Sequence, residues 1–288
     1  MSKLVFLLVL LSAPLLTAQS AVPEGSWISA DSSWEDIEIL TLDSEDRAIR
    51  MTRSFDEAGR LHYTYQEGRI LPSRTPRFAF HETCMLAEGN AGILQKRLSE
   101  SGEIALGDVQ RSEACLLIGG RCFRSAREII PQTLEGEQEA AQQFVALVNM
   151  SVYALQSQID GFGTEDLISY WREEETFPGM SGSASVSMRS SGRVMFFFPR
   201  LPVKFDMMFD SFSVIEGMVL TGSQTIHSQN RRGDGYLYGA LEIEGTADII
   251  YGQEDGTGAV VIREGTVAGG TLEVVTGLRR YLIDAAVR

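Results

Sequence analysis

Three cysteines are the residues of this 288-residue chain whose chemistry is easiest to anticipate: Cys84, Cys115 and Cys122. The last two flank Gly119-Gly120, a pair typical of a β-hairpin turn, and we predict a disulfide between them. In that hairpin Leu117 faces Cys122, so the bridge requires a diagonal approach. Cys84 paired to either of the other two is the alternative, and an odd count leaves at least one thiol.

A zinc site is the other chemistry that these cysteines suggest, because His81 and Cys84 have the spacing of a ligand pair. Six residues separate the later two cysteines, which is wider than the usual close pair, and cysteines of exported proteins are more often oxidised. We therefore predict no metal and no cofactor.

Catalytic patterns are incomplete. The run Gly179-Met180-Ser181-Gly182-Ser183 approaches a nucleophile elbow, but it ends in serine and precedes a predicted strand instead of joining a strand to a helix. The three histidines, His62, His81 and His227, have no nucleophile and acid placed beside them by sequence. We assign no catalytic residue and predict a protein that is not an enzyme.

Carboxylates keep one enzymatic alternative open. The densest acidic groups are 173–175 and 254–255, each beside a predicted loop. Glycosidases use two carboxylates whose approach is set by the fold and not by sequence spacing. A hydrolase acting through carboxylates is therefore an alternative function.

Residues 1–20 have the three parts of a secretory signal peptide. Lys3 precedes an apolar run, 4–16, which is followed by the small-residue segment Thr17-Ala18-Gln19-Ser20-Ala21. The run is too short for a comfortable membrane span, and no second long apolar run follows, so we predict no transmembrane span in the mature chain. We expect the protein to be periplasmic or extracellular.

The charge balance excludes one class of partner. Lys and Arg number 25 and Asp and Glu 39, for a formal net charge of −14, which repels phosphate backbones and disfavours nucleic acid. Only Lys3, Lys96 and Lys204 are lysines, a bias that indicates a GC-rich, bacterial genome.

The region 21–80 reads as strands and hairpins. We predict strands at 36–41, 47–53 and 60–65, the last from the alternation of Leu61, Tyr63 and Tyr65 with polar residues. The run Phe55-Asp56-Glu57-Ala58-Gly59-Arg60-Leu61 resembles one unit of the tyrosine-aspartate repeats of large bacterial surface and toxin proteins. Such repeats work as arrays, so a single copy implies a hairpin and no function.

The region 81–178 is predicted to be helical. The main helix spans 135–160, and its apolar face carries Ala141, Phe144, Val148, Val152, Leu155 and Ile159. A shorter helix follows from Thr164, and two further helical pieces lie near 83–99 and 123–130.

The region 179–288 is predicted to be an antiparallel β-meander of about seven or eight strands. We expect strands at 184–189, 194–198, 203–209, 213–220, 223–228, 236–251, 259–264 and 271–276. Gly239 or Gly245 should divide the longest of these. The whole is an α+β protein whose helical middle partly covers the C-terminal sheet, with 21–288 as one domain or as these three regions.

Five apolar residues of the C-terminal region are candidates for lining a pocket: Phe196, Phe198, Phe205, Met207 and Phe209. We predict an exported, soluble protein of the bacterial envelope or exterior with a non-catalytic structural or binding role, whose partner is a protein or an apolar ligand. A periplasmic carrier of lipid or of another apolar molecule is the alternative that these residues favour.

Overall fold

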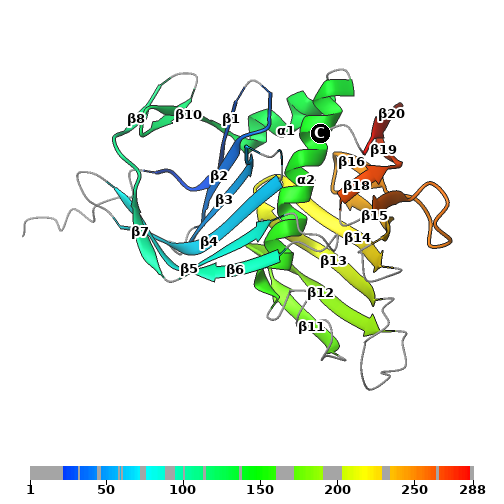
Figure 1. Ribbon diagram of the computed structural model, residues 1–288. Helices are drawn as coiled ribbons and strands as arrows, with labels where there is room; N and C mark the ends of the chain where they lie inside the picture. Colours follow the sequence, from blue (N-terminus) through cyan, green and yellow to red (C-terminus); the bar gives the residue numbers. More distant parts are fainter. Residues whose placement is uncertain are drawn as a thin grey trace, which may run out of the picture.

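Two antiparallel sheets lie on either side of a long helix, α2 (Gln138–Gln158), in an α+β arrangement (Figure 1). The structure, a computed structural model, describes residues 22–31, 33–43, 47–57, 59, 61–71, 76–87, 95–99, 101–112, 115–135, 138–159, 172–190, 203–228, 234–263 and 266–285. The predicted signal peptide, 1–20, lies outside the described residues.

The first sheet contains ten strands and precedes the helices in the chain. In spatial order they run β6-β5-β4-β3-β2-β1-β10-β9-β8, and β7 pairs with β5. Three of them, β2 (Ile37–Leu42), β3 (Arg47–Phe55) and β4 (Leu61–Leu71), confirm the predicted strands. The others are β1 (Gly25–Ala30), β5 (Arg77–Ala87), β6 (Gln95–Ser99), β7 (Gly102–Ala105), β8 (Val109–Arg111), β9 (Leu116–Ile118) and β10 (Arg121–Ser125).

The helix predicted near 83–99 is wrong, because β5 and β6 occupy its described part. β5 pairs with β4 on one side and with β6 and β7 on the other, and this pairing decides its conformation over local preference. The short helix predicted near 123–130 is present but shifted: it is α1 (Ala126–Glu135), which follows β10 directly and contains Pro131. The helix predicted from Thr164 lies outside the described residues.

The second sheet follows the helices and also contains ten strands. Its spatial order is β11-β12-β13-β14-β15-β16-β19-β20, with β17 beside β15 and β18 beside β17. The strands are β11 (Arg172–Pro178), β12 (Ser181–Ser190), β13 (Val203–Ile215), β14 (Met218–Ser228), β15 (Gly235–Ile243), β16 (Ala247–Ile250), β17 (Val260–Arg263), β18 (Thr266–Gly269), β19 (Thr271–Thr276) and β20 (Arg279–Asp284).

Two glycines set turns that decide the strand boundaries here. Gly217, with φ 82°, turns β13 into β14, so the strand predicted at 213–220 is wrong and straddles this turn. Gly245, with φ 66°, divides the predicted strand 236–251 into β15 and β16. It is one of the two glycines at which the sequence predicts this division. The strand predicted at 194–198 lies outside the described residues.

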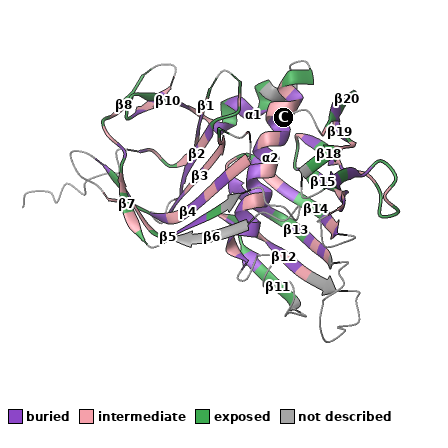
Figure 2. Cartoon of the chain, viewed as in Figure 1, coloured by how far each residue is buried: buried purple, intermediate pink, exposed green. Residues whose placement is uncertain are grey.

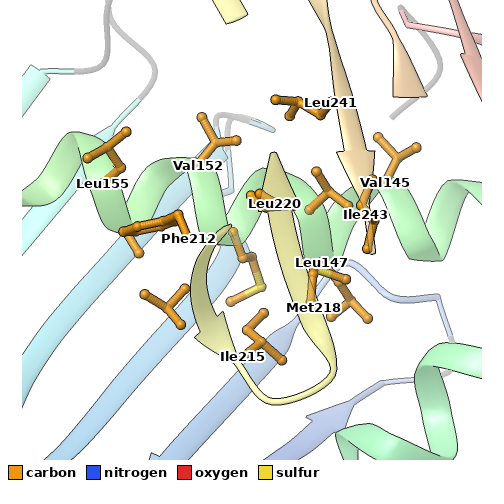
Figure 3. Close-up of a cluster of buried hydrophobic side chains, with 14 of the residues drawn as sticks. Val145, Leu147, Val152, Leu155, Phe212, Ile215, Met218, Leu220, Leu241 and Ile243 are labelled. Carbon is orange, nitrogen blue, oxygen red and sulfur yellow. The ribbon is translucent and has the colours of Figure 1, made fainter. Parts of the chain in front are cut away.

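Helix α2 is apolar around most of its circumference, and the two sheets cover it on two sides. The predicted face is buried, and a second buried stripe includes Leu147, Met150 and Ala154. The helix contacts β3, β4 and β5 of the first sheet and β13 and β20 of the second. Figure 2 shows the buried positions concentrated on α2 and the strands that flank it. Figure 3 shows Leu147 and Val152 of α2 among Phe212, Ile215 and Met218 of the second sheet.

A chain of buried hydrogen bonds joins the two sheets beside this core. The Thr41 Oγ1 donates to the Val214 carbonyl at 3.1 Å, so the Ser26 Oγ, 2.8 Å away, is the donor to Thr41. The Glu216 backbone N–H then donates to the Ser26 Oγ at 2.7 Å. Two hydroxyls of the first sheet thus bind the Val214 carbonyl at the end of β13 and the Glu216 N–H in the turn that follows.

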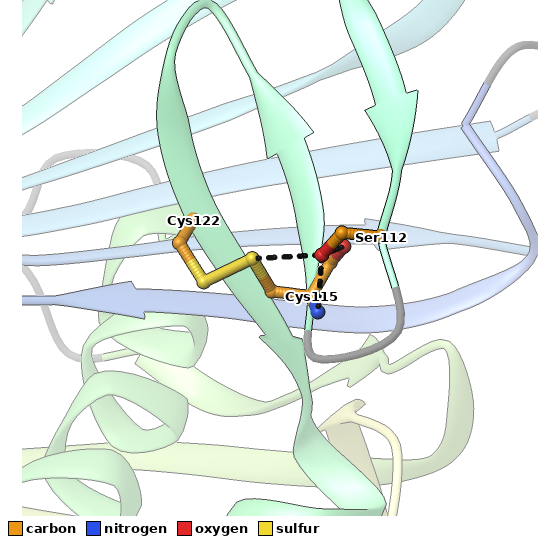
Figure 4. Close-up of a disulfide and its surroundings, with 3 residues drawn as sticks. All are labelled: Ser112, Cys115 and Cys122. Carbon is orange, nitrogen blue, oxygen red and sulfur yellow. Dashed lines mark hydrogen bonds between the residues drawn. A yellow bond between two sulfur atoms is a disulfide. The ribbon is translucent and has the colours of Figure 1, made fainter.

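The disulfide joins Cys115 and Cys122, as predicted (Figure 4). Cys122 pairs with Leu117 across the hairpin of β9 and β10, so Cys115 reaches it diagonally from the residue before β9. Ser112 holds Cys115 in place, since its Oγ accepts from the Cys115 N–H at 3.1 Å and donates to the Cys115 carbonyl at 2.9 Å. Cys84 lies buried on β5 and takes no part in a disulfide.

Truncation of the helix core tests the role of α2. Leu147 is 0% exposed, so we expect Leu147→Ala to lower the free energy of unfolding by about 2–5 kcal/mol. Leu282, 60% exposed on β20, is the matched control, and Leu282→Ala should change it by less than about 0.5 kcal/mol. Urea denaturation followed by tryptophan fluorescence measures both; equal losses would contradict the placement of α2.

Removal of the disulfide tests its stabilising effect. The bridge spans a sequence separation of 7 residues, and the chain entropy of so short a loop corresponds to about 2.5 kcal/mol. We expect the double substitution Cys115→Ser and Cys122→Ser to lower the free energy of unfolding by that amount. A reductant should bring the wild type to the same value and leave the double variant unchanged, and sensitivity of the variant to reductant would argue against this pairing.

Candidate ligand-binding pocket

A pocket of about 400 Å³ opens where three parts of the fold meet. The first part is the loop 31–36 with the adjoining ends of β3 and β4, the second is one face of α2, and the third is formed by β18, β19 and β20. The α2 residues that line it include Glu139, Gln142, Ala146, Asn149 and Tyr153, whose spacing of three and four places them on one face of the helix. The pocket therefore uses a helix face that neither sheet fully covers.

Asp31 organises the loop that forms one wall. Its carboxylate accepts hydrogen bonds from the Ser33 Oγ at 2.7 Å, the Glu35 N–H at 3.0 Å and the Asp36 N–H at 3.3 Å. Burial alone would raise the pKa of Asp31, but these hydrogen bonds outweigh it and lower the pKa below its usual value. The loop holds Trp34 at φ 60°, a strained backbone conformation for a bulky residue.

Arg53 fastens this loop to β3. Its Nη1 donates to the Trp34 carbonyl at 2.7 Å and to the Glu35 carbonyl at 3.3 Å. Its guanidinium carbon lies 4.9 Å from the centre of the Phe55 ring, a cation–π contact. The Arg53 Nε is buried and has no acceptor among the described residues.

Two tyrosines form the floor between the first sheet and the helix. The rings of Tyr63 on β4 and Tyr153 on α2 have centroids 3.7 Å apart. Burial, reinforced by Tyr153, raises the pKa of Tyr63 well above its usual value, although Arg53 acts in the opposite direction. The Tyr63 ring therefore presents a neutral phenol near neutral pH.

The remaining lining combines apolar surface with exposed carboxylates. Glu35, Glu139 and Asp284 come from three different elements, and all three are exposed at the rim. The apolar part is contributed by Leu61, Val145, Ala146, Val267, Leu272 and Ile283. Such a site suits a small molecule with an apolar body and a polar end.

The apolar residues predicted to line a pocket lie elsewhere. Phe205, Met207 and Phe209 share one face of β13 and are buried in the core that packs on α2, where the Gln156 amide lies 3.7 Å from the Met207 Sδ. Phe196 and Phe198 lie outside the described residues. None of the described members lines the 400 Å³ pocket, and neither do the three cysteines.

The structure places His62, His227, Glu174 and Glu254 outside the pocket. His62 is 3.1 Å from an Asp56 oxygen, and the His227 ring is 2.9 Å from the Tyr236 hydroxyl. Glu254 pairs with Lys204 at 3.0 Å. Ser185 donates to Glu174 at 2.6 Å. None of these residues belongs to the pocket.

Sequence reasoning missed every residue of the pocket as a site residue. One signal in the sequence could have indicated the site: a polar stripe formed by Glu139, Gln142 and Asn149 on the otherwise largely apolar helix α2. Trp34 and Arg53 carried no such signal, because only the fold of the loop 31–36 brings them together.

The described residues contain no group of three or more His, Cys, Asp or Glu side chains arranged to hold a metal ion. No helix in this part of the chain has the length and apolarity to cross a membrane. No protein-family model, no curated protein and no solved structure matches this chain.

Replacement of Asp31 tests how the loop is held. We expect Asp31→Ala to lower the free energy of unfolding at pH 6 by about 1 kcal/mol, a small effect because the three hydrogen bonds that it removes are exposed to solvent. Because the folded-state pKa lies below the ordinary value of 3.8, this contribution is complete above that value and is lost as the pH falls through the folded-state pKa. Urea unfolding at pH 6 and at pH 3 should show a larger difference between variant and wild type at pH 6 than at pH 3; an equal difference at both values would contradict the role of the carboxylate.

Proposed function

We propose that this chain is an exported, non-catalytic binding protein that holds a small molecule in the pocket between α2, the loop 31–36 and β18–β20. The observation that carries the proposal is the pocket itself. Its volume of about 400 Å³ falls within the roughly 300–1,000 Å³ of small-molecule sites, and its lining joins aromatic and aliphatic surface to a few polar groups.

The pocket is built on fixed elements, which suits binding. α2 is buried on its other faces, and the loop is fastened by Asp31 and Arg53 before any ligand arrives. A site organised in advance loses less conformational entropy when it binds, so more of the contact energy remains as affinity.

Export is supported by the disulfide and by the signal-like residues 1–20. The Cys115–Cys122 bond fits an oxidising compartment such as the periplasm or the exterior. The acidic composition, with a net charge of −14, fits a partner other than nucleic acid.

The two alternative functions differ from this proposal at specific residues. A carrier built around Phe205, Met207 and Phe209 needs space at these side chains, which are 6%, 0% and 4% exposed within the core. A hydrolase acting through carboxylates is favoured by one observation, the three acids Glu35, Glu139 and Asp284 around one pocket. Binding without turnover distinguishes our proposal from the hydrolase.

Filling the pocket tests the proposal. The probe is N-phenyl-1-naphthylamine, a neutral apolar fluorophore whose emission rises when it leaves water. We expect the wild type to bind it, and we expect Ala146→Phe, which places a ring inside the pocket, to weaken binding at least tenfold. Fluorescence titration measures both affinities.

The matched control is Ala240→Phe, since Ala240 is exposed on β15 and does not line the pocket. It should bind the probe as the wild type does, and circular dichroism should show both variants folded. Absence of binding by the wild type, or an equal loss in both variants, would refute the proposal. Mass spectrometry of molecules extracted from purified protein should return them uncleaved after incubation with the protein, whereas cleaved products would favour the hydrolase.

A further inference from the structure

We infer that the pocket selects an organic cation: a protonated amine or guanidinium carried on a flat aromatic or apolar body. This inference rests on the proposed function and deepens it by naming the class of ligand. It follows from the distribution of charge, aromatic rings and apolar surface over the pocket wall.

Negative charge dominates the mouth of the pocket. Two exposed acids of the lining, Glu35 and Glu139, outnumber the one cation among its described residues, Arg53, whose Nη1 already donates to the two loop carbonyls and whose Nε is buried. In the described part of the chain no ion pair joins Glu35 or Glu139 to a cation. The Arg53 side chain contacts the backbone carbonyls of the loop and not the Glu35 carboxylate. The rim therefore attracts a positive group and repels a negative one, as does the chain as a whole.

The helix end that opens on the pocket does not attract an anion either. A helix N-terminus ordinarily favours negative charge, but Glu139 lies in the first turn of α2 and supplies that charge from the protein. An anionic ligand at this end would meet the Glu139 carboxylate.

The interior suits the body of such a ligand. The rings of Trp34, Tyr63 and Tyr153 line the pocket with Leu61, Val145 and Ile283. These groups offer apolar contact to a flat molecule, and aromatic faces also attract a cation that approaches them. The exposed rim carboxylates then meet the charged end, while the body lies inside.

Displacement of the bound fluorophore by indole compounds of opposite charge tests the inference. Tryptamine, a cation at pH 7, and indole-3-propionate, an anion, share the same ring. We expect tryptamine to displace N-phenyl-1-naphthylamine at about tenfold lower concentration, since each exposed ion pair contributes modestly. Raising the salt concentration to 0.5 M should reduce this advantage, because exposed charges are screened.

A double variant isolates the carboxylates. Glu35→Gln with Glu139→Gln should bring the tryptamine advantage close to one, with both indole compounds compared within the variant after its own affinity for the neutral fluorophore has been measured. The matched control, Glu242→Gln with Glu244→Gln, changes two exposed acids that do not line the pocket and should keep the advantage.

The outcomes separate this inference from the proposed function. If the fluorophore binds and Ala146→Phe weakens it, but indole-3-propionate competes as well as tryptamine, the pocket is a binding site and the cation preference is wrong. The preference is also wrong if it survives in the rim double variant. If the wild type does not bind the fluorophore, the proposed function fails and this inference fails with it.

Discussion

The need to cover α2 on two sides shapes the whole molecule. A helix with two buried apolar stripes is unstable in water alone, because most of its surface is apolar and must lie against other elements. One sheet comes from the chain before it and one from the chain after it, and each supplies the face that the other leaves open. The pocket lies along the polar stripe of the helix, at the margin that the two sheets share.

The loop 31–36 shows how local hydrogen bonding prepares a site at that margin. The Asp31 carboxylate accepts hydrogen bonds from backbone N–H groups of the loop, and Arg53 on β3 donates to two of the loop's backbone carbonyls. The strained backbone of Trp34 is maintained by these contacts and not by its own preference. Because the loop is held in this way, the Glu35 carboxylate lies at the rim of the pocket and the Trp34 ring forms part of its wall.

Much of the fold was predictable from sequence, because alternation and helical periodicity are local signals. The strands β2, β3 and β4 and the helix α2 follow from such patterns, and so does the diagonal approach of Cys115 to Cys122. The described parts of the segment 83–99 were predicted wrongly because strand pairing determines their conformation, β5 pairing with β4 and β6 pairing with β5. The apolar face of β13 was visible, but periodicity does not distinguish a face packed on a helix from one lining a cavity. The pocket was not visible at all, since Trp34, Tyr153 and Ile283 are remote in sequence and meet only through the arrangement of both sheets.

The position of α2 in the middle of the chain has a consequence for biogenesis. Synthesis proceeds from the N-terminus, so the first sheet and the helix are complete while residues 172–284, which include every strand of the second sheet, are still to come. During that interval the face of α2 that meets Phe212 and Met218 is bare, and the hydroxyls of Ser26 and Thr41 lack the turn that they bind. The nascent chain therefore exposes this apolar face of α2 until the strands of the second sheet have been synthesised.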